Sequence, residues 1–233
     1  MRIYRNFTEA LSEIKRDLAE MGINIHTQTY QDKYIGDKEE MATKELQNYI
    51  YTVTEPYYDR DLKPIQPWAD AEFQERINFK SNPGEAWKLR EEIWTEFIQP
   101  DGTFAYSYGD RLAWQVEEIV KTLTSDPSSR QAFMGMWNAP TDIERTGGIS
   151  RVPCTLGYHF QIRKNKLNIT YLQRSADYAT HFVNDIYLAG RMHTHIFQLL
   201  LQEQGLGGGL EIGSYTHWIG SLHVFNKDIK GVF

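Results

Sequence analysis

The sequence predicts an α+β fold in which helices and strands are mixed without regular βαβ alternation. Three observations support this class. Apolar residues recur at helical spacing in the first half of the chain, they alternate at strand spacing in much of the second half, and no repeat or composition shift divides the 233 residues. We therefore expect residues 1–233 to form a single domain, which is long enough to bury a sizeable core.

The first half of the chain is expected to be mainly helical. The helices predicted from their apolar stripes cover residues 7–21, 69–79, 85–97 and 112–123. Asn6 and Glu9 form a capping box before the first of them, and Gly22 ends it. Residues 23–30 alternate as in a strand, whereas residues 45–54 are ambiguous with a β-rich end.

The second half contains most of the predicted strands. These are residues 131–137, a hairpin with alternating runs at 158–162 and 167–171, and residues 210–225. A long helix is expected at 185–203. The glycine-rich segment 205–209 lacks the Lys and Ser/Thr of a phosphate-binding loop and is interpreted as a connector.

Composition excludes several classes of protein. A single cysteine rules out an internal disulfide framework and any zinc site built from several cysteines. The 25 basic and 31 acidic residues give a net charge of −6, which argues against stable nucleic-acid binding. No apolar run resembles a transmembrane helix or a signal peptide. We expect a cytoplasmic protein without a membrane partner.

Cys154 is the first candidate for chemistry. A free cysteine is most often a small buried hydrophobic residue, but a cation nearby could make it a nucleophile, and Arg130, Arg151 and Arg174 are available. The cluster 173–177 (QRSAD) is either an exposed turn or an anion site. His193 and His195 lie two apart on an expected helix and so point to different faces, and no metal is expected.

The order of these motifs is more specific than any one of them. It resembles the thymidylate synthase superfamily over roughly residues 68–226, through Ile93-Trp94, residues 104–109 (FAYSYG), 126–130 (DPSSR), Pro153-Cys154, 173–177, Asn184-Asp185 and 220–223 (GSLH). The resemblance implies a large mixed sheet layered with helices, in a homodimer packed sheet to sheet. It also implies transfer of a one-carbon unit from 5,10-methylenetetrahydrofolate to C5 of a pyrimidine nucleotide, without a metal.

Motif position then implies roles for the nucleotide-binding residues. Cys154 resembles the nucleophile that adds to C6 of the base, and Arg174 and Ser175 resemble phosphate ligands of the same subunit. Arg130 resembles an arginine supplied by the partner subunit of the homodimer. Gln173 lies where the family contacts the nucleotide and the nucleophile region.

Further roles concern the folate and the sugar. Asp177 resembles the carboxylate that binds the pterin ring, Trp94 a tryptophan beside the folate, and Tyr108 the active-site tyrosine. His223 resembles the histidine that reads the sugar 3′-hydroxyl, but Phe225 replaces its usual tyrosine partner, so a ribonucleotide stays possible. Gln131 also stands where a second phosphate arginine is expected, which leaves the remaining phosphate ligands open.

Asp185 points to the base. Synthases carry an asparagine eight residues after the QRSAD aspartate, and this chain carries Asp185 there. An ionised carboxylate only accepts hydrogen bonds, so it suits the 4-amino group of cytosine and opposes O4 of uracil. Cys154-Thr155 replaces the usual Cys-His as well. Both departures resemble the phage deoxycytidylate (dCMP) hydroxymethylases and favour dCMP as substrate.

A glutamate is expected to manage protons and water. Motif counting places it at Glu72, with Glu75 as its rival one helical turn later. Water held by this glutamate would become the hydroxyl of 5-hydroxymethyl-dCMP. The alternatives are methylation of dCMP with release of dihydrofolate, a dUMP-directed synthase or hydroxymethylase, and a non-catalytic nucleotide- or RNA-binding homologue.

Overall fold

The computed structural model describes all residues of the chain except 31–32, 35, 79–81, 147–150 and 204–208. Its strands are β1 (Arg2–Tyr4), β2 (Ile23–Ile25), β3 (Thr29–Tyr30), β4 (Lys33–Tyr34), β5 (Thr43–Val53), β6 (Phe133–Gly135), β7 (Thr155–Arg163), β8 (Lys166–Asp177) and β9 (Glu211–Phe225). Its α-helices are α1 (Phe7–Met21), α2 (Tyr58–Asp61), α3 (Trp68–Ile77), α4 (Glu91–Trp94), α5 (Tyr108–Ser125), α6 (Ala139–Asp142), α7 (Phe182–Gln202) and α8 (Ile229–Val232).

A mixed seven-stranded sheet organises the fold. The strand order is β1-β5-β9-β8-β7-β6, with β2 also paired to β5. The pairs β1–β5 and β8–β9 are parallel, while β5–β9, β7–β8 and β6–β7 are antiparallel. This arrangement confirms the predicted α+β class, because strands distant in sequence pair without a βαβ repeat.

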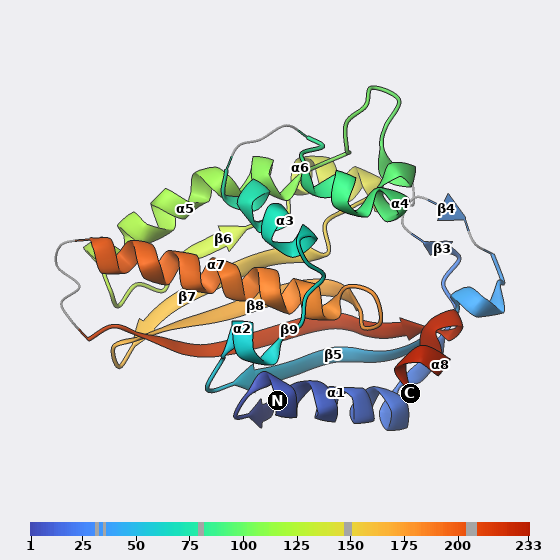
Figure 1. Ribbon diagram of the computed structural model, residues 1–233, viewed down its shortest axis with the longest axis horizontal. Coiled ribbons are helices and arrows are strands. Elements are labelled where there is room, and N and C mark those ends of the chain that lie inside the picture. Colours follow the sequence, from blue (N-terminus) through green and yellow to red (C-terminus); the bar gives the residue numbers. More distant parts are fainter. Residues whose placement is uncertain (31–32, 35, 79–81, 147–150, 204–208) are drawn as a thin grey trace.

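Helices cover the sheet in Figure 1, where α3, α5 and α7 lie together above the long strands and α1 lies beside β5. The helix beginnings follow local chemistry. Asn6 caps α1 by accepting the N–H of Glu9 at 2.9 Å, whereas the Glu9 carboxylate binds the N–H of Arg5 rather than that of Asn6. Ser107 caps α5 through the N–H of Asp110.

Several predicted boundaries were wrong. Residues 23–30 form two short strands, β2 and β3, which join different sheets. The stretch 85–97 is not one helix but a 3₁₀ turn over Ala86–Arg90, the short α4 and a 3₁₀ turn over Thr95–Phe97. Trp87, Ile93, Trp94 and Phe97 of this stretch line the cavity described below, so tertiary contacts overrode the local helical pattern. The predicted connector at 205–209 lies, apart from Gly209, outside the described residues.

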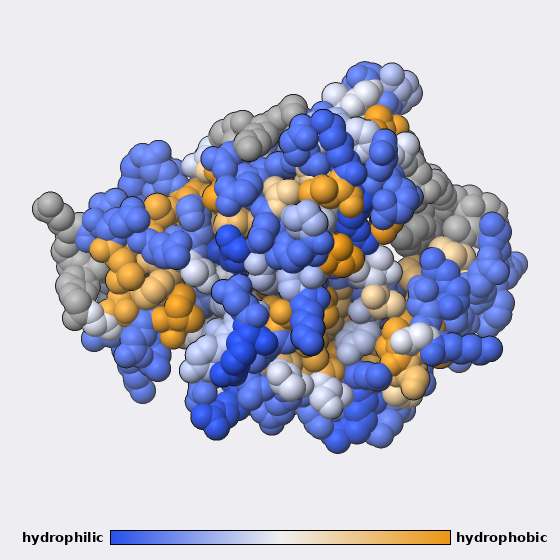
Figure 2. Space-filling model, viewed as in Figure 1, coloured by the Kyte–Doolittle hydropathy of each residue, from blue (hydrophilic) through white to orange (hydrophobic). Residues whose placement is uncertain are grey.

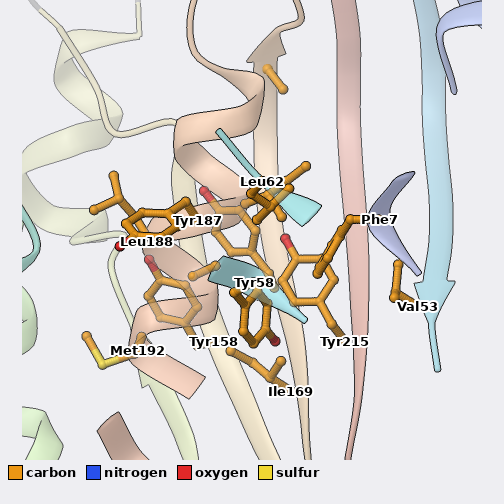
Figure 3. Close-up of a cluster of buried hydrophobic side chains, with 14 of the residues drawn as sticks. Phe7, Val53, Tyr58, Leu62, Tyr158, Ile169, Tyr187, Leu188, Met192 and Tyr215 are labelled. Carbon is orange, nitrogen blue, oxygen red and sulfur yellow. The ribbon is translucent and has the colours of Figure 1, made fainter. Parts of the chain in front are cut away.

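Aromatic side chains dominate the core between the sheet and the first helices. Phe7 of α1, Tyr58 of α2 and Tyr215 of β9 lie together in the cluster drawn in Figure 3. Their ring centroids are 5.3–6.0 Å apart. Such pairs add about 0.5–1.5 kcal/mol each beyond the burial of their area. The packing is close, because a side chain at Gly190 of α7 would clash with the Tyr58 ring.

The surface is largely polar. On the face seen in Figure 2, hydrophilic residues predominate and hydrophobic residues form small separated groups. Among the described residues, no helix is both long and apolar enough to span a bilayer.

Candidate active site

A cavity of about 430 Å³ lies at one end of the sheet, between the strand ends and the segments around α3, α4 and α5. It gathers residues that are far apart in the sequence. The residues singled out above that line it include Glu72, Glu75, Trp94, Tyr108, Arg151, Cys154, Arg174, Ser175, Asp177, Asp185, His223 and Phe225.

Strand register brings Cys154 and Arg174 together. Antiparallel pairing sets Thr155 opposite Gln173, so the residue before β7 meets Arg174 of β8. The N–H of Arg174 donates to the Cys154 carbonyl at 2.8 Å. Its guanidinium donates to the carbonyls of Pro153 and Val152 at 2.9 and 3.0 Å. The arginine thereby holds the loop that carries the half-buried thiol.

Opposing effects act on the Cys154 thiol, and their net result is a raised pKa. Burial raises the pKa of Cys154, while the positive charges of Arg174 and Arg151 lower it and Asp185 raises it further. The Arg174 Nη2 lies 3.7 Å from the Cys154 Sγ. A cation at this distance favours the thiolate, which is the reactive form of cysteine.

The parallel register of β8 and β9 places a second group of polar residues. Ser175 pairs with Ser221, and Asp177 pairs with His223. Asp177 accepts the N–H groups of Ala179 and Thr180, which turns the chain toward α7. Burial lowers the pKa of His223, although the Asp177 carboxylate opposes that shift.

Asp185 lies in the first turn of α7 and faces the same cavity. Its Oδ2 accepts a hydrogen bond from Gln173 Nε2 at 2.7 Å. Burial raises the pKa of Asp185 to about 6, although Gln173 and Arg76 favour the ionised form. Gln173 itself is 1% exposed and lies behind Asp185 rather than among the cavity-lining residues.

The two glutamates of α3 differ in what they bind. Glu72 accepts a hydrogen bond from the buried Arg76 at 3.0 Å, one helical turn away. Glu75 accepts the N–H of Ala86 at 2.7 Å and so anchors the loop that follows α3. Both glutamates line the cavity, and the choice of Glu72 over Glu75 for proton transfer stays a prediction.

Tyr108 is the first residue of α5 and lines the cavity. The Arg76 guanidinium lies 4.1 Å from the centroid of its ring. Burial raises the pKa of Tyr108 well above its usual value, so its hydroxyl keeps its proton and can donate a hydrogen bond.

Aromatic rings form one wall of the cavity. Trp94 packs against Phe97, Phe104 and His181 with centroid separations of 6.0, 6.5 and 5.6 Å. The Arg151 guanidinium lies 5.0 Å from the Trp94 ring centroid. The Trp94 indole N–H is buried without a hydrogen-bond acceptor among the described residues. This wall suits a flat ring system that carries hydrogen-bond acceptors.

Arg130 is placed elsewhere. Its side chain is exposed and lies with Gln131 and Ser128 in a separate surface depression. It is not among the residues that line the cavity of its own chain. Its contribution across a subunit interface stays a prediction.

Arg76 and His181 are among the cavity side chains that sequence reasoning missed. Arg76 could have been found from the i, i+4 spacing that pairs it with Glu72. His181 gave no such signal, because the turn between β8 and α7 is what brings its ring to the cavity. Burial and the nearby Arg90 lower the pKa of His181 to about 4. Among the described residues, no group of three or more His, Cys, Asp or Glu side chains could hold a metal ion.

Comparison with known proteins finds relatives that are named as thymidylate synthases. A protein of Methanosarcina mazei, provisionally named a thymidylate synthase, is 26% identical over 202 residues, covering 84% of this chain and 80% of the relative. The thymidylate synthase of Bacillus subtilis subsp. natto is 27% identical over 156 residues. That alignment covers 62% of this chain and 52% of the relative, so the match spans about half of that enzyme.

The fold agrees with these relatives. The thermostable thymidylate synthase A of Bacillus subtilis superimposes with a TM-score of 0.75 over 97% of this chain and 82% of that structure, at 21% identity. The family model described as thymidylate synthase matches residues 68–232, which include every cavity residue predicted above. On this match, the chain belongs to the thymidylate synthase family.

Proposed function

We propose that this chain is a deoxycytidylate 5-hydroxymethylase, which converts dCMP, methylenetetrahydrofolate and water into 5-hydroxymethyl-dCMP and tetrahydrofolate. Its family supports the coarser statement, namely transfer of a one-carbon unit from methylenetetrahydrofolate to a pyrimidine nucleotide. The choice of base and of product is the proposal.

The single observation that carries the proposal is Asp185. This carboxylate faces the cavity in which the candidate nucleophile Cys154 lies. Gln173 donates a hydrogen bond to one of the two carboxylate oxygens. The carboxylate can accept a hydrogen bond from the 4-amino group of cytosine but repels O4 of uracil. With a pKa raised to about 6, it can also hold a proton and donate to cytosine N3.

Cys154 supplies the covalent step. Its thiolate adds to C6 of the ring, which makes C5 nucleophilic toward the folate methylene. C5 then loses its proton, tetrahydrofolate leaves, and water adds to the exocyclic methylene before the thiolate departs. Arg174 supports the thiolate form and also holds the Cys154 loop in place.

Glu72 is the proposed residue for water and proton handling. It lines the cavity, and its hydrogen bond to the buried Arg76 orients the carboxylate that would act as the base. Tyr108 stays protonated next to this pair and supplies a hydrogen-bond donor.

The other wall fits the cosubstrate. Trp94 and its aromatic neighbours offer faces for the flat pterin, and Asp177 offers a carboxylate at the strand end. Ser175 and Arg174 face the cavity as phosphate ligands, and His223 does so as the sugar ligand. In a homodimer, the exposed Arg130 would reach the phosphate of the other subunit, as the family motif implies.

Product analysis tests the proposal. Purified protein is incubated with methylenetetrahydrofolate and either dCMP or dUMP, and the nucleotide products are identified by mass spectrometry. We expect 5-hydroxymethyl-dCMP, and no product from dCMP in the Cys154→Ser variant. Methyl-dCMP with dihydrofolate would instead support a methyltransferase, and product from dUMP alone would refute the cytosine assignment.

A further inference from the structure

Behind Asp185, a line of buried polar side chains runs across the sheet. Gln173 Nε2 lies 2.7 Å from Asp185 Oδ2, His217 Nε2 lies 3.0 Å from Gln173 Oε1, and Tyr51 Oη lies 3.2 Å from His217 Nδ1. Tyr51 and His217 are 0% exposed, and Gln173 is 1% exposed. None of these three lines the cavity, and the chemistry proposed above uses neither Tyr51 nor His217.

Sheet geometry explains why these side chains meet. Tyr51 of β5 lies directly opposite His217 of β9, and His217 lies beside Tyr171 of β8. Gln173 comes two residues after Tyr171, so it points to the same face of the sheet. Asp185 of α7 reaches the line from the helix that covers that face.

Hydrogen-bond chemistry determines which group is the donor and which the acceptor at each contact of this line. An ionised Asp185 only accepts, so Gln173 must turn its NH₂ group toward it and its carbonyl toward His217. His217 then carries its hydrogen on Nε2, and its Nδ1 accepts the hydroxyl hydrogen of Tyr51. Burial lowers the pKa of His217 well below its usual value, so the ring is neutral and carries a single N–H, as this assignment requires.

We propose that Tyr51 and His217 are positioning residues, which fix the side-chain amide of Gln173 so that Asp185 is held as a hydrogen-bond acceptor toward the base. If the amide turned over, its carbonyl would face the Asp185 carboxylate at a distance where two acceptors repel. Only a protonated Asp185 tolerates that arrangement. The inference rests on the proposed function in one respect, namely that Asp185 reads the base.

Other groups around Asp185 must be kept constant in a test. The charged and titratable residues that act on it, or on which it acts, are Glu72, Arg76, Tyr108, Cys154, Tyr158, Tyr171 and Asp177. None of them is changed in the variants below. His217 also stacks on Tyr171 with a centroid separation of 4.5 Å, so an aromatic replacement preserves that contact.

The direct measurement is the titration of the Asp185 carboxyl. The full-length protein is labelled with ¹³C at the aspartate carboxyl carbons, and the Asp185 signal is assigned by its loss in Asp185→Asn. In His217→Phe the ring stack remains but the donor to Gln173 is lost, and we expect the pKa of Asp185 to rise by about 1 unit. His217→Gln restores a donor near the Nε2 position and should keep the pKa close to the wild-type value.

The outcomes separate positioning from packing. A folded His217→Phe variant with an unchanged Asp185 pKa would overturn the proposal, and so would an equal rise in His217→Gln. If His217→Phe does not fold, Tyr51→Phe takes its place. Tyr51→Phe removes the hydroxyl that fixes the tautomer of the His217 ring, so a smaller rise in the Asp185 pKa is expected. An unchanged Asp185 pKa in this variant would again overturn the positioning role.

A second readout is the ratio of kcat/KM for dCMP to kcat/KM for dUMP. It should fall in His217→Phe and recover in His217→Gln. If Asp185 does not read the base, this ratio stays constant while the carboxyl pKa still moves. Failure of the proposed function is thus distinguishable from failure of the positioning role.

Discussion

Replacing Asp185 by asparagine changes the hydrogen-bonding character of the base site with little change in shape. The new side chain can still accept the Gln173 N–H through its carbonyl oxygen, which preserves the 2.7 Å contact. Its NH₂ group then faces the cavity, where it opposes the 4-amino group of cytosine but can donate to O4 of uracil. We expect Asp185→Asn to lose activity on dCMP and gain activity on dUMP.

The size of the switch follows from the unpaired groups. A buried polar group without a partner costs about 1–3 kcal/mol. The substitution adds one such penalty for dCMP and removes one for dUMP. The difference in transition-state free energy between the two substrates should therefore change by about 2–6 kcal/mol. That corresponds to a factor of roughly 30 to 10⁴ in the ratio of the two kcat/KM values.

Tritium release from nucleotides labelled at C5 measures both values at neutral pH with methylenetetrahydrofolate. Asp177→Asn is the matched control, because it makes the same chemical change at another aspartate that lines the cavity. That control should weaken use of the folate but leave the base preference unchanged. An unchanged dCMP-to-dUMP ratio in Asp185→Asn would refute the assignment of Asp185 to the base.

The same variant tests the electrostatics. The pKa of Asp185 is raised from 3.8 to about 6 in the folded protein, so the folded state binds more protons than the unfolded state between these values. The wild type therefore loses stability from this group as the pH rises from about 4 to about 6. Asp185→Asn lacks this loss, so its stability relative to the wild type should rise over that window by about 3 kcal/mol. A difference that does not vary with pH would contradict the raised pKa.

Three further predictions concern the cavity and the core. Glu72→Gln should lower kcat by roughly 10²–10⁴-fold, whereas Glu75→Gln, whose amide oxygen can still accept the Ala86 N–H, should leave kcat close to the wild-type value; equal effects on kcat would argue against choosing Glu72. Gly190→Ala should destabilise the fold by about 1–3 kcal/mol in chemical denaturation because of its clash with an aromatic ring, while Gly231→Ala, with open space around it, should be near neutral. Burial lowers the pKa of His193 from 6.5 to about 4, so the wild type should lose stability from this group as the pH falls through that range, and His193→Gln should show a shallower fall in melting temperature; parallel curves would contradict this.

Much of the chemistry was predictable from the chain alone. Local patterns predicted helices α1, α5 and α7 and the β7–β8 hairpin from their regular apolar spacing, although α5 and α7 begin four and three residues before the predicted starts. The motif around Cys154 and the QRSAD cluster identified a family that the comparisons bear out over residues 68–232. Short or broken elements were missed, since packing rather than local propensity decides them.

The sequence by itself determined which reactive groups exist: one thiol, an arginine twenty residues later, and a carboxylate eight residues after the QRSAD aspartate. Only the tertiary structure decided what each group touches. Strand register joins Cys154 to Arg174, and the covering helix places Asp185 against Gln173. The line from Gln173 through His217 to Tyr51 joins residues up to 166 positions apart. Such contacts depend on long-range strand pairing, which no local pattern of residues encodes.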